Sequence, residues 1–355
     1  MTDPGSGPAA RRRVTVLVGL AAAVVVAFVL AVALGSTPMP LDRAVLALLR
    51  ADAADPGDEV IIWTVRLPRA VTALLAGAAL SVAGVQMQTL FRNPLAEPYI
   101  LGVSSGASLG VALVVTGWGG LAGAFTGGIA GLGRAGVVVA ASGGAAAVLG
   151  LVLVLSRRVR SVVTLLVIGV MVGSATASII TLLLAYSDAQ RAQQYLGWSL
   201  GSYAGTTWGD LALFAPVCGT ALVAALAGVK PLNALLLGEG YARTMGVRVR
   251  RVRTVTLLTA SVLAGSVTAY CGPVAFLGLA VPHMAKLLLG TADHRVLLPG
   301  AVLLGAAVSL ACCVATQAPG SGSVLPLNAV TTVLGAPVVI TILLRSRTAR
   351  SGWAV

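Results

Sequence analysis

The sequence predicts an all-α polytopic membrane protein with about ten membrane-crossing helices. Apolar residues make up 57% of the 355 residues and charged residues only 10%, whereas a soluble globular domain has roughly 25% charged residues. Apolar runs of about 20 residues recur along the chain, and a helix of that length spans a bilayer. The basic residues gather at the ends of these runs, as they do at the cytoplasmic ends of membrane helices.

Ten apolar segments, each bounded by charge, Gly or Pro, are the predicted spans. Eight are long: 14–34, 70–90, 136–155, 161–185, 211–229, 254–271, 296–315 and 328–344. Two others, 99–117 and 273–289, are shorter and interrupted by Gly or Pro, which is tolerated at membrane depth where protein or water satisfies the freed backbone groups. The first run follows three arginines, as in a signal peptide. Because no small-residue cleavage site follows this run, we expect it to be the first membrane-spanning helix and not a signal peptide.

An even number of spans places both ends of the chain on one side of the membrane. Arginines cluster near both ends and in the segment 231–253, which predicts that these parts are cytoplasmic. The segment 41–69 has four arginines against five acids, as expected of a loop on the outer side. The predicted organisation is therefore a cytoplasmic tail 1–13, a ten-span domain 14–345 that contains the cytoplasmic loop 231–253, and a cytoplasmic tail 346–355.

Several function classes are disfavoured by what the sequence contains. The net charge of +13 would suggest nucleic acid in a soluble protein, but its placement at span ends explains it without such a partner. A P-loop motif is missing, so ATP would bind another chain. Ionisable side chains at midplane usually serve ion-driven carriers, and the spans contain no acid, although unwound backbone can also hold ions. The four cysteines and two histidines form no metal-binding pattern, and no paired carboxylates or activated nucleophile suggest an enzyme.

Three stretches are too specific to be membrane filler. The first is Arg66-Leu-Pro-Arg69, and the second runs from Leu90 to Pro98 and continues into Leu101-Gly-Val-Ser-Ser-Gly106. Two prolines and an Asn-Pro step in the second stretch predict a fixed turn. The third runs from Gly238 to Gly246 inside the basic segment. Its acid near the start and glycine at the end predict a short helix, and Gly272–Gly278, Pro282-His283 and Asp293-His294-Arg295 follow downstream.

In order and spacing, these stretches resemble the FecCD family, the permease subunits of bacterial ABC importers for iron chelates, haem and cobalamin. The resemblance runs from about Pro40 to Arg345. It implies a type II ABC importer permease of the cytoplasmic membrane that forms a homodimer. Its expected partners are two cytoplasmic ATPase subunits, which hold the ATP and Mg²⁺, and a periplasmic or lipid-anchored substrate-binding protein. The chain itself would need no cofactor and catalyse no reaction.

The resemblance also implies roles for individual residues. Arg66 and Arg69 match outward-facing arginines that dock the binding protein, although they could instead anchor the second span at the interface. The residues that match the loop in the ATPase cleft are Gly238, Glu239, Ala242, Arg243 and Gly246. An ordinary amphipathic interfacial helix is the alternative there. The residues expected to build the structural turn are Arg92, Asn93, Pro94, Glu97 and Pro98.

The chain departs from the family pattern before the tenth span. Gln317 stands where the family commonly has an outward arginine, and Val324 and Asn328 replace a glutamate and a glycine. The departure puts a third docking arginine in doubt.

The sequence therefore predicts the permease of an importer for a ferric chelate, either a siderophore complex or haem. A cobalamin or oxyanion importer is the alternative, with an ATP-independent carrier less favoured. In the expected mechanism, closure of the ATPases moves the helix around Glu239 and shifts the fifth and tenth spans, which line the dimer axis. On the fifth span, four hydroxyl side chains could line the pathway or simply pack: Ser174, Thr176, Ser178 and Thr181.

Overall fold

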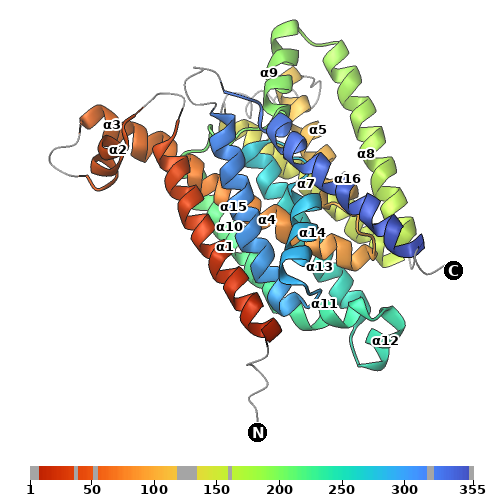
Figure 1. Ribbon diagram of the computed structural model, residues 1–355. Helices are drawn as coiled ribbons and strands as arrows, with labels where there is room; N and C mark the ends of the chain where they lie inside the picture. Colours follow the sequence, from red (N-terminus) through yellow and green to blue (C-terminus); the bar gives the residue numbers. More distant parts are fainter. Residues whose placement is uncertain are drawn as a thin grey trace. The chain divides into compact units, whose positions relative to one another are not determined.

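The computed structural model describes residues 8–35, 39–50, 55–117, 134–158, 162–317 and 324–351 (Figure 1). All regular structure in these residues is helical. The chain divides into two compact units, which are described separately: residues 1–85 together with 275–355, and residues 86–274. Parts of the predicted tails, 1–7 and 352–355, lie outside the described residues.

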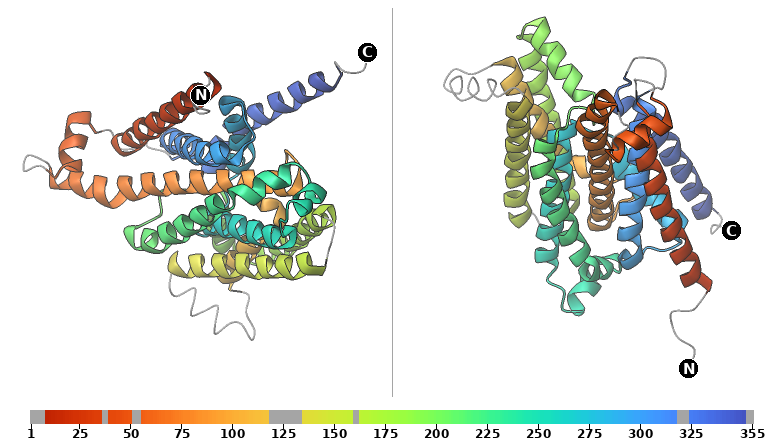
Figure 2. Two further views of the ribbon diagram at one scale, coloured as in Figure 1. Left: turned by 90° about the horizontal axis from the view of Figure 1, so that it is seen from below. Right: turned by 90° about the vertical axis from the view of Figure 1, so that its left-hand side faces the viewer.

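The first unit contains both ends of the chain. Its helices are α1 (Pro8–Ala33), α2 (Leu41–Leu48), α3 (Pro56–Val60), the π-helix η1 (Ile61–Arg66), most of α4 (Leu67–Phe91), α14 (Leu277–Leu289), α15 (His294–Thr316) and α16 (Leu327–Ser351). Helices α1 and α15 lie side by side (Figures 1 and 2).

The second unit is the middle of the chain. After the last turns of α4 come the 3₁₀-helix η2 (Pro98–Leu101), α5 (Val103–Thr116), α7 (Arg134–Arg158), α8 (Val162–Ala185), α9 (Ala189–Ser199), α10 (Trp208–Ala227), α11 (Val229–Leu236), α12 (Glu239–Thr244) and α13 (Val249–Cys271). Within this unit, α9 and α12 lie at opposite ends (Figures 1 and 2).

Each of the ten predicted spans corresponds to a helix. Among the described residues, seven helices are long and apolar enough to cross a membrane, and three shorter apolar helices lie at 103–116, 277–289 and 327–341. The two short spans predicted from Gly and Pro are α5 and α14. The prediction of an all-α polytopic fold is therefore confirmed.

The segment 41–69, predicted as a loop, is instead largely helical. Asp55 accepts a hydrogen bond from the backbone N–H of Gly57 at 2.8 Å and so caps α3. Arg43 forms ion pairs with Asp55 at 3.1 Å and Asp58 at 2.6 Å. The Arg50 guanidinium lies 4.2 Å from the ring centroid of Trp63. Five of the charged residues that suggested an outer loop thus pair with one another: Arg43, Arg50, Asp55, Asp58 and Glu59.

Small residues set the helix packing in the first unit. A side chain on Gly77 would overlap the backbone carbonyl of Gly305, and one on Gly84 would overlap that of Gly278. The Ser309 hydroxyl donates to the carbonyl of Ala73 at 2.6 Å. Helices in lipid gain no hydrophobic force from one another, so they associate through such close contacts. The Gly- and Ala-rich spans therefore form the contacts of α4 with α14 and α15.

The second unit is packed in the same way. Gly106 and Gly110 of α5 face the backbone of Gly144 and Ala140 of α7, with no room for a side chain on either glycine. At the far end of α13, the backbone N–H of Ser202 donates to the carbonyl of Cys271 at 2.8 Å. Helix α13 thus runs from the α12 end of this unit to the α9 end.

Candidate functional site

Arg66 and Arg69 lie where η1 passes into α4, and both side chains are buried, at 2% and 4% exposure. Arg66 Nη1 donates to the carbonyls of Val32 at 3.2 Å and Ala33 at 2.5 Å. The last carbonyls of a helix have no partner within the helix and gain from cationic donors. The two guanidinium groups therefore cap the carboxyl end of α1, with Arg69 Nη2 donating to Ala31 and Leu34 at 3.2 Å each.

The outward orientation of these two arginines stays a prediction, but their side chains are buried rather than exposed. They lie inside a continuous helical segment rather than ahead of a span, and their donors point to α1. Even Gly35 is crowded, because a Cβ there would lie 3.0 Å from the Arg66 guanidinium. The docking role itself stays a prediction. In this geometry neither guanidinium group is exposed to a binding protein.

The departures before the tenth span have structural roles. Gln317 is 3% exposed and is the C-cap residue of α15. Asn328, at the start of α16, accepts a hydrogen bond at 3.0 Å from the backbone N–H of Ala275, just ahead of α14. Val324 is 53% exposed, and the residues 318–323 between them lie outside the described part of the chain. The asparagine thus supplies a backbone partner that glycine could not.

The predicted turn after α4 is present in the second unit. The Asn93 carboxamide oxygen accepts from the backbone N–H of Leu95 at 2.9 Å, which is an Asx-turn. Pro94 lies within that turn, and Glu97 and Pro98 begin η2. Arg92 has a φ of 48°, and its guanidinium lies beside Gly238, where a Cβ would be 3.5 Å away.

Glycines define both ends of α12. Gly238 precedes it with a φ of 109°, and Gly246 follows it with a φ of 78°. The N–H of Gly246 donates to the Arg243 carbonyl and the N–H of Val247 to the Ala242 carbonyl, both at 3.0 Å. This pair of bonds is a Schellman motif. The prediction that Gly246 ends the helix is confirmed.

One carboxylate fastens α12 to α13. Glu239 accepts from Arg243 at 3.1 Å, one turn along α12, and from Arg253 of α13 at 2.9 Å. The Arg253 side chain is 9% exposed and that of Glu239 is 29% exposed, so this second pair is partly shielded from water. Ala242 is fully buried. Sequence reasoning missed Arg253, although Glu239 was the single acid among five arginines and needed a partner.

The opposite face of α12 is apolar and uncovered. Tyr241 of α12 and its C-cap residue Met245 lie four residues apart and are 56% and 58% exposed. Leu237, which is 62% exposed, is the C-cap residue of α11 and is separated from α12 by Gly238. Residues four apart share one face of a helix. Aromatic residues and methionine are enriched at protein–protein interfaces. The helix is thus anchored on one side and free on the other.

Helix α8 also has an uncovered face. Only 22% of its apolar stretch is buried, and Ser174, Ser178 and Thr181 share an exposed side. The hydroxyls of Ser178 and Thr181 donate to carbonyls one turn earlier at 3.0 Å. Thr176, in contrast, is buried. Three of the four predicted lining groups therefore lie together at the surface.

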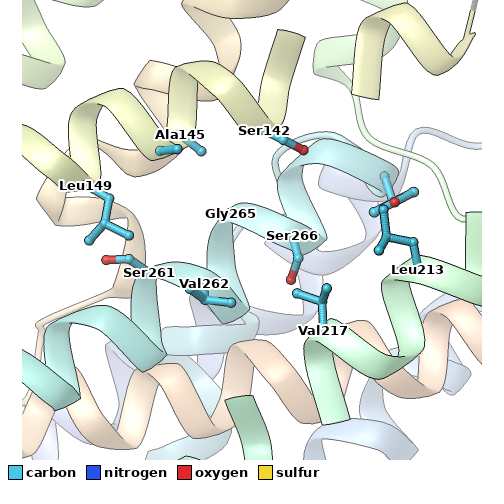
Figure 3. Close-up of a pocket in the computed structure, with 11 residues that line it drawn as sticks. Ser142, Ala145, Leu149, Leu213, Val217, Ser261, Val262, Gly265 and Ser266 are labelled. Atoms are coloured by element: carbon cyan, nitrogen blue, oxygen red, sulfur yellow. The ribbon is translucent and has the colours of Figure 1, made fainter. Parts of the chain in front are cut away.

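A cavity of about 260 Å³ lies between α7, α10 and α13. Figure 3 shows Ser261 and Ser266 of α13 near Leu149 of α7 and Val217 of α10. The lining is apolar apart from three serines and Tyr270, so it offers neither a carboxylate nor a metal ligand. Across the described residues, no group of three or more His, Cys, Asp or Glu could hold a metal ion.

The all-helical membrane domain is of a class found among transport permeases, and comparison with known proteins gives that class. The chain belongs to the FecCD transport family, whose profile matches residues 23–345. It is 37% identical over 302 residues to the vitamin B12 import system permease protein BtuC of Salmonella paratyphi A, covering 82% of this chain and 87% of the relative. It is 36% identical to the same protein of Klebsiella pneumoniae, covering 81% and 84%.

A solved structure is also similar. It is described as a metal-chelate type ABC transporter in an inward-facing conformation, and it matches with a TM-score of 0.80 and 27% identity, over 93% of this chain and 99% of that one. The protein is therefore a multi-pass permease subunit of an ABC importer in the inner membrane. It works with a separate ATPase, which hydrolyses the ATP, and with a substrate-binding protein.

The capping role of Arg66 predicts a folding defect that needs no partner. Arg66→Met should lower the thermal unfolding temperature of the purified permease, because unpartnered buried carbonyls cost about 1–3 kcal/mol. Arg43→Met is the matched control, since its ion pairs are partly exposed and such pairs contribute less than about 1 kcal/mol. If R66M unfolded like the wild type but lost affinity for the binding protein, docking would be its role.

Proposed function

We propose that this permease imports cobalamin or a closely related corrinoid. The observation that carries the proposal is the 37% identity, over most of both chains, to a vitamin B12 permease. Cobalamin is itself a large metal chelate, so the likeness to a metal-chelate transporter supports the same cargo class. A ferric siderophore or haem, the cargo predicted from the sequence, is the second candidate and is favoured by that structural likeness.

We infer that α12 receives the force of the ATPase. Its exposed Tyr241 and Met245, with Leu237 at the end of α11 just before it, provide an apolar contact for the partner. The bridge from Glu239 to Arg253 joins α12 to the first turns of α13. A push on α12 would therefore move α13, a 23-residue span. This assignment puts α12 on the cytoplasmic side, in agreement with the arginines around it. Both chain ends are proposed to lie on that side too, because arginines also cluster there.

We propose further that two copies assemble around α8. A spanning helix that is mostly unburied within one chain must face lipid or protein. The hydroxyls of Ser178 and Thr181 donate within their own helix, but each can still accept a hydrogen bond, which a water-filled path between two copies would supply and lipid would not. Docking of the binding protein is not assigned to Arg66 and Arg69, because both are buried.

Breaking the bridge should uncouple the transporter without unfolding it. Glu239→Gln should lower cargo-stimulated ATP hydrolysis about tenfold, because a hydrogen bond between charged groups contributes roughly 1.5–3 kcal/mol. The measurement is ATPase activity of the reconstituted complex with and without loaded binding protein. Basal hydrolysis and complex assembly should change little.

The arginines provide the control for that experiment. Arg253→Gln should match E239Q, whereas Arg243→Gln should have a smaller effect because the Arg243 side chain is 67% exposed and its pair is solvent-screened. The exchange E239R with R253E should restore part of the stimulation. Full coupling in both E239Q and R253Q would refute the transmission role.

The α8 assignment predicts selective labelling. Ser178→Cys should react with a membrane-impermeant thiol reagent in the assembled importer, whereas Val154→Cys, on the exposed face of α7, should react slowly because it faces lipid. The four native cysteines are buried, so background labelling should be low. Equal, slow reaction at both positions would place α8 against lipid and contradict the proposal.

The cargo is tested in proteoliposomes that contain the permease, its ATPase and a binding protein loaded with cobalamin, ferric siderophore or haem. We expect ATP hydrolysis to be stimulated by the cobalamin-loaded protein. Stimulation by an iron chelate alone would overturn the cargo and leave the importer class intact. The free binding protein and the empty vesicles serve as controls.

A further inference from the structure

A second cavity, of about 190 Å³, lies where α10 ends and α13 begins. Its walls are mostly apolar and include Ala224 of α10, Leu232 of α11, and Val252 and Val255 of α13. The charged side chain at this cavity is that of Arg251. Residues of α12 do not line it, so it is separate from the surface assigned to the ATPase.

The cations at this cavity are not neutralised within the described residues. Arg251 is exposed, and neither it nor Lys230, next to Pro231 in the cavity wall, is in an ion pair with a described carboxylate. The neighbouring acid, Glu239, is already held by Arg243 and Arg253. This end of the unit therefore keeps uncompensated positive charge.

Arg251 stands at the start of an exposed apolar stripe on α13. Val255 and Leu258 follow it by four and seven residues, and each is 42% exposed. On the neighbouring helix α10, Val223 and Leu226 lie three residues apart and are 66% and 37% exposed, and Lys230 follows on the separate helix α11, which begins after Gly228. Residues at this spacing share one helix face. An occupant that satisfies this surface needs an anionic head and an apolar tail.

We propose that this cavity binds one acidic phospholipid. The phosphate lies at Arg251 and Lys230, and an acyl chain follows the groove between α10 and α13 past Val255 and Leu258. Basic pockets between membrane helices bind acidic lipid head groups in this way. A soluble partner is a poorer fit, because the apolar stripes run along the spanning helices. The site does not depend on which cargo the importer carries.

The test uses the full chain in detergent, with phosphatidylglycerol titrated and bound lipid counted by native mass spectrometry. We expect one phosphatidylglycerol to be retained per chain, and the zwitterionic phosphatidylcholine to bind much more weakly. The double variant K230Q/R251Q should bind phosphatidylglycerol about 30-fold more weakly, because each cation near an acidic surface contributes about fivefold. R248Q is the matched control for Arg251, the charged residue of the cavity lining: it removes a neighbouring exposed arginine that does not line the cavity.

A steric variant tests the groove without changing the charge. Ala224→Phe should fill part of the cavity and weaken lipid retention while the protein still elutes as a folded complex. Equal retention of the two lipids by the wild type would overturn the site. So would equal weakening by R248Q and K230Q/R251Q, which would indicate only diffuse attraction. If K230Q/R251Q kept its lipid but lost the ATPase, the surface would belong to the ATPase instead.

Discussion

The fold depends on one constraint of the bilayer: helices surrounded by apolar solvent gain nothing from hiding apolar surface against one another. The helices must therefore attract one another through close contact of their backbones. Glycines, which lack side chains, allow that contact in this chain. Gly77 against Gly305 and Gly84 against Gly278 set the first unit, and Gly106 against Gly144 sets the second. Because a single methyl group would force these helices apart, the glycines fix which helices can be neighbours, and the positions of the functional residues follow from that.

The same constraint explains how much could be predicted. Ten spans and the all-helical fold follow from apolar length alone, and Gly246 as a helix end follows from its conformational freedom. The burial of Arg66 and Arg69 could not be predicted, because their partners are backbone carbonyls more than 30 residues away, and a carbonyl has no sequence signature. The bridge from Glu239 to Arg253 also joins two elements across a turn. A pattern of periodicity along one helix gives no information about such a contact.

The two arginine sites show how one residue type serves two different purposes. The Arg66 guanidinium donates hydrogen bonds to the last carbonyls of α1, and so holds that helix to the start of α4. The Arg251 side chain is exposed and forms no ion pair with a described carboxylate, and so remains available to a ligand. A count of charges treats Arg66 and Arg251 alike, yet only Arg251 can contact a ligand directly. Burial, rather than the number of arginines, therefore determines which of them can recognise a partner.

Helix α12 has only six residues, too few to persist in water, since isolated helices below about 12–15 residues are marginal. It exists because glycines at both ends, the Schellman motif and the Glu239 bridge hold it in shape when the protein folds. Its conformational entropy is therefore lost once, during folding. A preordered contact loses less affinity to ordering, so in the proposed coupling role the ATPase would bind a helix that is already formed, and no affinity would be lost to forming it.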